Sequence, residues 1–203
     1  MLFNDRTTPL SLLQTRRSGK PREMIAPGPG ADQIDAILAI AARTPDHGKL
    51  NPWRFVVIED DQRPAFALRL VEILRAEKPD ATPRDEEAAA QFATQAPALI
   101  VVLSAPVVGH KVPLWEQELS AGAVCMNLLH ATHAMGFVGS WITGWAAYSD
   151  GVRDLFGAAP QRIAGFLFLG SPGRPLEERP RGALSEIVHR WKSGDGPKSD
   201  LVY

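Results

Sequence analysis

The spacing of apolar side chains along the chain predicts alternating helices and short strands. Apolar residues recur at helical spacing in residues 32–41, 61–76 and 115–135. Two uninterrupted apolar runs, residues 97–104 and 163–169, have the length of strands buried on both faces. Residues 53–59 are rich in β-branched and aromatic side chains, and residues 138–145 suggest a strand and turn broken by glycines. We therefore expect helices packed around a small sheet.

Local signals indicate where several of these elements begin and end. Three leucines precede residues 15–18, which indicates a first helix that ends at its two arginines. Residues 21–30 are rich in proline and glycine and suggest a loop. We expect Asp32 to cap the second helix, and Gly136 to end the long one.

Two segments are predicted to lie outside this framework. Residues 77–95 combine two prolines, a charge cluster and an alanine run, so we interpret them as a mobile lid that contains a short helix. The C-terminal extension, residues 171–203, is rich in proline but still carries apolar side chains. Because exposed apolar groups favour burial, we expect this extension to dock on a partner subunit.

The long helix also predicts a dimer. Residues 119–129 are apolar on nearly every helix face, so most of the surface of this segment should be buried. One chain of 203 residues hardly has enough layers to cover such a helix. A homodimer with this helix near the shared interface is the simplest solution.

Composition excludes several classes of function. Hydrophobic residues make up 45% of the chain and charged residues 22%, which is ordinary for a globular domain. A net charge of -1 gives no general attraction to nucleic acid or to an anionic membrane. The longest apolar run is too short to span a bilayer, and no secretory signal is visible. The single cysteine, Cys125, excludes an internal disulfide framework, and we expect a cytoplasmic protein with Cys125 as an inert buried thiol.

Common catalytic motifs are absent. Gly28-Pro-Gly30 does not continue into a dinucleotide-binding fingerprint, and neither a Walker phosphate loop nor a nucleophile elbow is present. His130 and His133 share a helix face and could bind a metal, but no cysteine or carboxylate ligand lies nearby in the sequence. We therefore expect them to be partners in a buried or interfacial helix and predict no metal site.

Two polar segments stand out as candidate binding sites. Residues 16–18, Arg-Arg-Ser, offer permanently charged, planar donors that suit a phosphate, or they simply complement the dipole of a helix C-terminus. In the second segment, residues 43–53, His47 could bind a ligand or satisfy local backbone, and Asn51 could form an Asx turn before Pro52. Trp53 opens a strand and is expected in the core.

Four segments resemble the FMN-dependent nitroreductase family, and they occur in the family's order. They are Arg16-Arg17-Ser18, Arg43 to Trp53, His110 to Gly122, and Gly139 to Thr143. The third segment resembles the small bacterial YdjA-like subgroup. The resemblance covers residues 10–170 and implies an α+β, nitroreductase-like three-layer fold. In that fold a central, mostly antiparallel sheet is flanked by helices, and two chains form an intertwined homodimer.

The resemblance also implies the residues that bind the cofactor at the subunit interface. From one subunit these are Arg16, Arg17, Ser18, Trp141, Ile142 and Thr143. From the opposite subunit they are Arg43 and His47. The subgroup has a polar or basic residue where this chain has Ile142, so we expect a backbone contact there. Arg179 and Arg181 could meet the phosphate, as two basic residues do in more distant members, but they are not part of the predicted set.

The implied reaction needs no catalytic side chain, because FMN itself carries the chemistry. NAD(P)H, the reducing co-substrate, would deliver a hydride to flavin N5, and a nitroaromatic, quinone or related acceptor would then take it. With no separate dinucleotide-binding motif, the two substrates should share one site and follow ping-pong kinetics. Alternative readings keep the fold but assign enone reduction, flavin breakdown, or a non-catalytic flavin-binding or storage dimer.

Overall fold

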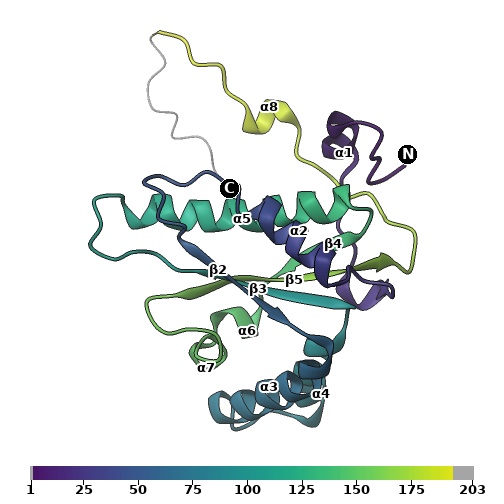
Figure 1. Ribbon diagram of the computed structural model, residues 1–203, viewed down its shortest axis with the longest axis vertical. Coiled ribbons are helices and arrows are strands. Elements are labelled where there is room, and N and C mark those ends of the chain that lie inside the picture. The colour runs from purple at the N-terminus through teal and green to yellow at the C-terminus, as the bar shows by residue number, and fades with distance from the viewer. Residues whose placement is uncertain (1, 194–203) are drawn as a thin grey trace.

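An antiparallel sheet of five strands runs through the centre of the computed structural model, which describes residues 2–193 (Figure 1). The strands follow the order β1-β5-β3-β2, and β4 also pairs with β5. Their bounds are β1 Met24–Ile25, β2 Trp53–Ile58, β3 Ala98–Ser104, β4 Val138–Ile142 and β5 Arg162–Pro172. The prediction of a mostly antiparallel central sheet is confirmed.

The two apolar runs of the sequence form the middle of the sheet. β3 is buried along its whole length, and β5 pairs with β3 on one edge and with β4 and β1 on the other. Residues 166–169 of β5 have no exposed surface. Alternate side chains enter opposite cores, because successive residues of a strand point to opposite faces. Strands that are apolar on both faces are therefore required here.

Helices cover both faces of the sheet and complete three layers (Figure 1). On one face lie α2 Ala31–Ala41 and α5 Leu114–Ala134, whose apolar side chains share a core with alternate residues of β3 and β5. On the other face lie α3 Arg63–Glu77, α4 Pro83–Thr94, α6 Trp145–Tyr148 and α7 Asp150–Arg153. A cluster of phenylalanines fills this second core: Phe66, Phe92, Phe156, Phe166 and Phe168. The predicted layer architecture is confirmed.

The remaining elements are short and lie outside the three layers' main helices and strands. The N-terminal α1, Pro9–Thr15, sits near the C-terminal end of α5, and the turns η1 Pro21–Glu23 and η2 Asp60–Gln62 connect larger elements. After β5 the chain runs away from the sheet through the short α8, Leu184–Ile187 (Figure 1). Leu184, Ile187 and Trp191 are each more than 70% exposed. The apolar residues of the extreme C-terminus, Leu201, Val202 and Tyr203, lie outside the described residues.

Local predictions differ from the structure at three boundaries. The second helix begins at Ala31 with Gly30 as its N-cap, so Asp32 is not the cap; the Gln33 side chain accepts a hydrogen bond from the Gly30 N–H at 3.0 Å instead. The first helix ends at Thr15, one residue before the arginines. The expected loop over residues 21–30 contains β1, which pairs with the end of β5. A two-residue strand has no periodicity, so only pairing with a distant strand defines it.

The segment proposed as a lid forms a regular helix. Thr82 caps α4 in a capping box with Asp85, and Ala89, Phe92 and Ala93 pack in the second core. The long helix agrees with its prediction: α5 ends at Ala134, and Gly136 follows with a φ of 92°, which a residue without Cβ adopts readily. Lid motion stays a prediction.

Candidate functional site

The segment after α1 is held at Arg17, whose backbone bonds the Asn4 side chain and whose side chain bonds the C-terminal tail. The side-chain amide of Asn4 donates to the Arg17 carbonyl at 3.2 Å, and its oxygen accepts from the Arg17 N–H at 2.8 Å. The Arg17 guanidinium reaches the tail, where it donates to the Glu177 carbonyl at 2.8 Å and lies 3.5 Å from the Glu178 carboxylate. The C-terminal extension is therefore anchored, at its start, to the predicted cofactor segment.

Arg16 is the unbalanced charge of this region. It is partly buried and donates to the Ser18 hydroxyl at 3.2 Å. Burial lowers its pKa, and the positive charges of Arg181 and Arg17 lower it further. Within residues 2–193, no carboxylate forms an ion pair with Arg16. Three guanidinium groups thus lie near one another here, and among the described residues only Arg17 has a carboxylate partner, an arrangement that favours a bound anion.

Arg181 is a functional candidate that the sequence left undecided. Its charge acts on Arg16 although 165 positions separate the two in the chain. The sequence showed two basic residues in the tail, Arg179 and Arg181, but not which of them lies near Arg16. Only the path of the chain after β5 brings one of them beside α1.

The end of β4 divides its side chains between the two faces of the sheet. Ile142 packs on the core beneath α3 and α4, whereas Trp141 points to the α5 side, where its ring meets Gly122. The Trp141 indole donates to the Ala164 carbonyl at 2.9 Å. Its ring lies flat on β5 only because residue 165 is glycine: a Cβ there would stand 2.0 Å from the indole nitrogen. The glycine that makes room for the Trp141 ring is therefore Gly165, on the neighbouring strand β5.

A mainly apolar cavity opens on the face of Ile142 and Thr143. It has a volume of about 460 Å³, and its walls include Leu74, Phe92 and Trp145. At its rim, Lys78 and Asp85 form an ion pair of 3.2 Å. A second cavity of about 310 Å³, lined by Lys20 and Arg22, shares Phe92 and Ile142 with the first. The residues just after Arg16-Arg17-Ser18 therefore border the same hollow as Ile142 at the end of β4.

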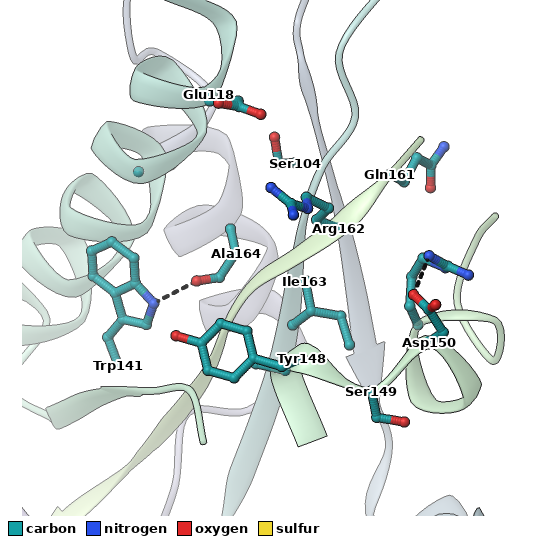
Figure 2. Close-up of a pocket in the computed structure, with 13 residues that line it drawn as sticks. Ser104, Glu118, Trp141, Tyr148, Ser149, Asp150, Gln161, Arg162, Ile163 and Ala164 are labelled. Atoms are coloured by element: carbon teal, nitrogen blue, oxygen red, sulfur yellow. Dashed lines mark hydrogen bonds and ion pairs between the residues drawn. The ribbon is translucent and has the colours of Figure 1, made fainter. Parts of the chain in front are cut away.

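Trp141 borders a different cavity, of about 420 Å³, at the end of the sheet (Figure 2). Figure 2 shows the Trp141 indole turned to the Ala164 carbonyl, with Tyr148, Arg162 and Ser104 around the hollow. The hydroxyl of Ser104 is buried and has no hydrogen-bond partner within the described part of the chain. Trp141 and Ile142, predicted to act together, thus line separate hollows.

The second segment forms a tight turn beside the N-terminal end of α5. The Asp46 carboxylate accepts hydrogen bonds from the backbone of Leu50 and Asn51. Asn51 has a φ of 46°, and its backbone N–H donates to the Asp46 carboxylate. The side chain that holds this turn is therefore that of Asp46 and not, as predicted, that of Asn51. His47 satisfies no local backbone; its Nδ1 lies 2.8 Å from the Glu116 carboxylate.

Within one chain this segment does not join the first. His47 pairs with Glu116 in the first turn of α5, whereas the charge of Arg16 acts on His133 in its last turn. At about 1.5 Å per residue, the helix puts roughly 26 Å between Glu116 and His133. Arg43 is exposed just after α2. Within one chain the two predicted segments therefore lie at opposite ends of α5.

Two residues assigned to packing behave as expected. Trp53 is only 4% exposed and belongs to the core beneath α2 and α5. Cys125 is fully buried, and burial raises the pKa of its thiol to about 12, so the unreactive thiol form dominates at neutral pH. In residues 2–193 we find no cluster of potential metal ligands, and no helix there has the length and apolar character to cross a membrane.

Sequence comparison identifies the family. The nitroreductase family model matches residues 16–171, a range that contains all three predicted cofactor segments. The chain belongs to the nitroreductase family. It is 40% identical over 164 residues to an Escherichia coli (strain K12) protein provisionally named NAD(P)H nitroreductase YdjA, covering 80% of this chain and 87% of that protein. A provisionally named NAD(P)H nitroreductase of Haemophilus influenzae is 36% identical over 167 residues, with the same coverage. The YdjA-like resemblance is confirmed.

Solved structures of nitroreductases share the fold. A nitroreductase-like family protein from Bacillus cereus superposes with a TM-score of 0.76 at 20% identity, covering 93% of this chain and 98% of that one. A nitroreductase from Bacteroides fragilis, solved with bound FMN, gives 0.68 at 19% identity and covers 91% and 98%. The nitroreductase fold is thus established for this chain.

Proposed function

We propose that this nitroreductase is an FMN-dependent NAD(P)H oxidoreductase that reduces nitroaromatic, quinone or related acceptors. The observation that carries the proposal is the uncompensated Arg16, flanked by Arg17 and Arg181. A phosphate dianion would neutralise this cluster, and guanidinium groups match phosphate oxygens in geometry. The residues present therefore fit the FMN that the family implies.

The hollow beside β4 fits the rest of the cofactor. Ile142 and Thr143 line a mainly apolar cavity of about 460 Å³, which suits a flat ring system. Lys20, in the adjoining cavity, offers a cation on the path from the arginines to Ile142. When bound, FMN supplies the hydride-accepting and hydride-donating chemistry. The chain's own residues hold the phosphate, orient the ring and exclude water.

A dimer would complete the site. If two copies of α5 cross in opposite directions, the N-terminal end of one helix lies beside the C-terminal end of the other, which brings His47 and Arg43 of one chain near Arg16 of its partner. The outward face of α5 supports this arrangement, since Trp115 is 67% exposed and Leu119 is 53% exposed. The exposed apolar residues of α8 are further surface that a partner subunit would cover.

The direct test is the colour of the protein and its response to reductant. Purified protein should be yellow, and NADPH should bleach it in the absence of oxygen. Arg16→Ala should lower FMN affinity at least tenfold, whereas Arg69→Ala, which removes an exposed guanidinium paired with Glu72 on α3, should leave it unchanged. Colourless protein that rejects added FMN would overturn the proposal. Yellow protein that NADPH does not bleach would leave only flavin storage.

Kinetics test whether the two substrates share one site. NAD(P)H and the acceptor should occupy the exposed face of the bound flavin in turn, so initial rates at several acceptor concentrations should give parallel double-reciprocal lines. Intersecting lines would show that both substrates bind together. Single turnover of the NADPH-reduced protein with nitroaromatic, quinone and enone acceptors would rank the acceptor classes.

A further inference from the structure

His133 occupies a fully buried position in the last turn of α5, between the arginine segment and β4. It has no exposed surface. Its Nε2 accepts a hydrogen bond from the backbone N–H of Gly139, in β4, at 3.3 Å. An acceptor nitrogen carries no proton, so this bond requires the neutral imidazole with its proton on Nδ1.

The other side of the ring faces the arginine segment. The backbone carbonyls of Leu129 and, more weakly, of Arg17 raise the pKa of the ring, which places both near it. Nδ1 itself is buried and has no hydrogen-bond partner among the described residues. The Arg17 backbone is fixed from its opposite side by Asn4. His133 therefore lies between the backbone of Arg17 and the backbone of β4.

The packing around His133 leaves little freedom for either segment. A Cβ at Gly139 would meet Leu129 of α5 at 2.6 Å, so β4 is pressed directly onto the helix. A Cβ at Gly19 would stand 3.1 Å from Val138, so the residues after Ser18 also lie against β4. His133, bonded to Gly139 and close to the Arg17 carbonyl, fills the space between these two segments.

We propose that neutral His133 is a positioning residue that fixes the Arg16–Ser18 segment relative to β4, and so sets the distance between the phosphate and ring ends of the proposed FMN site. The inference rests on the proposed function for the identity of the ligand, but the positioning itself belongs to the protein backbone. The neutral imidazole of His133 offers an acceptor and a donor on opposite edges of one rigid ring.

The electrostatic surroundings agree with this role. Burial, and then the charge of Arg16, lower the pKa of His133 to about 4, with a smaller effect of His130. The imidazole is therefore neutral at physiological pH. A protonated ring would place a second N–H against the Gly139 N–H and a second cation beside Arg16.

Two amide substitutions of His133 test the proposal with little change in size. Gln places its carbonyl oxygen near the position of Nε2 and can accept from Gly139, whereas the shorter Asn cannot reach it. The matched control is Thr132→Val: Thr132 is also fully buried, but its hydroxyl bonds only the Leu128 carbonyl of its own helix. The first readout is FMN affinity, measured by fluorescence well below each melting temperature.

We expect His133→Asn to weaken FMN binding at least tenfold and His133→Gln to remain within about threefold of the wild type, a free-energy contrast set by the Gly139 bond. Thr132→Val should bind FMN as the wild type does. Equal affinities for the Asn and Gln variants, or losses that simply follow stability across all three, would overturn the proposal.

Hydrogen exchange separates failure of this inference from failure of the proposed function. Amides of residues 16–20 and 138–143 should exchange faster in His133→Asn than in His133→Gln, whichever ligand the wild type binds. Wild-type protein without FMN affinity would defeat the proposed function alone. Unchanged exchange in both segments would defeat the positioning role alone.

Discussion

At the scale of single residues, glycines decide where aromatic and backbone groups can approach. Gly165 leaves room for the Trp141 ring, and Gly122 faces the same ring from α5 with more space, since its Cβ would lie 3.9 Å away. Both glycines sit in regular elements where glycine is otherwise unfavourable. Only Gly165 is required by the position of the Trp141 ring.

This contrast gives a prediction for two neighbouring alanine substitutions. Gly165→Ala should push Trp141 off β5, break its bond to Ala164 and destabilise the fold by about 1–3 kcal/mol. Gly122→Ala should be neutral or stabilise by up to about 1 kcal/mol, because alanine favours the helix. Urea unfolding and tryptophan emission measure both effects. Equal stability of the two variants would contradict the packing argument.

A second residue-scale prediction concerns acid. Because the folded state lowers the pKa of His133 to about 4 from an ordinary 6.5, the unfolded chain binds the proton first as pH falls. The stability that depends on neutral His133 is complete above pH 6.5 and should fall by on the order of 3 kcal/mol towards pH 4. His133→Gln should show a flatter profile in urea titrations. Parallel profiles for wild type and variant would refute this origin.

At the scale of elements, a buried arginine joins the segments that shape the cavity. Arg63, only 4% exposed, donates from α3 to the carbonyls of Ile58 at the end of β2 and of Ala93 and Ala96 around the end of α4. Burial lowers its pKa, while Asp60 and Glu59 act in the opposite direction. The C-terminal end of α4 is therefore tied to the sheet, so any lid motion belongs to its other end.

Removing this arginine should loosen α4. Arg63→Met keeps the apolar stem but leaves three carbonyls without their donor, which should destabilise the protein by about 2–4 kcal/mol. Arg69→Met, on the exposed face of the same helix, should change stability by less than about 0.5 kcal/mol. Thermal melting compares the two. Similar losses for both variants would show that Arg63 does not join these elements.

At the scale of the whole molecule, the apolar face of α5 and the exposed α8 indicate a missing partner surface. The prediction of burial on most sides of residues 119–129 holds towards the sheet, where Val124, Cys125 and Leu128 have no exposed surface. It is not met on the outer face, where Leu119 is 53% exposed. In the dimer proposed above, a second subunit would cover this outer face.

The dimer makes a clear prediction for charge on that face. Leu119→Glu should convert the protein to monomers and reduce FMN affinity at the same time, since it places a buried charge at the proposed interface. Leu68→Glu, at a 67% exposed position on α3, should change neither. Analytical ultracentrifugation and FMN titration measure both properties. A dimeric Leu119→Glu variant would exclude α5 from the interface.

The apolar pattern by itself determined the layers of this protein. Runs that are apolar on both faces had to become β3 and β5, and helical spacing placed α2, α3 and α5, because burial of apolar surface depends on periods that the sequence displays. Family motifs also indicated the candidate cofactor segments. The tertiary structure alone decided which of them meet: Arg181 beside Arg16, Trp141 and Ile142 on opposite faces, and His133 between two backbones. Such contacts join distant parts of the chain, and the local spacing of apolar residues carries no information about them.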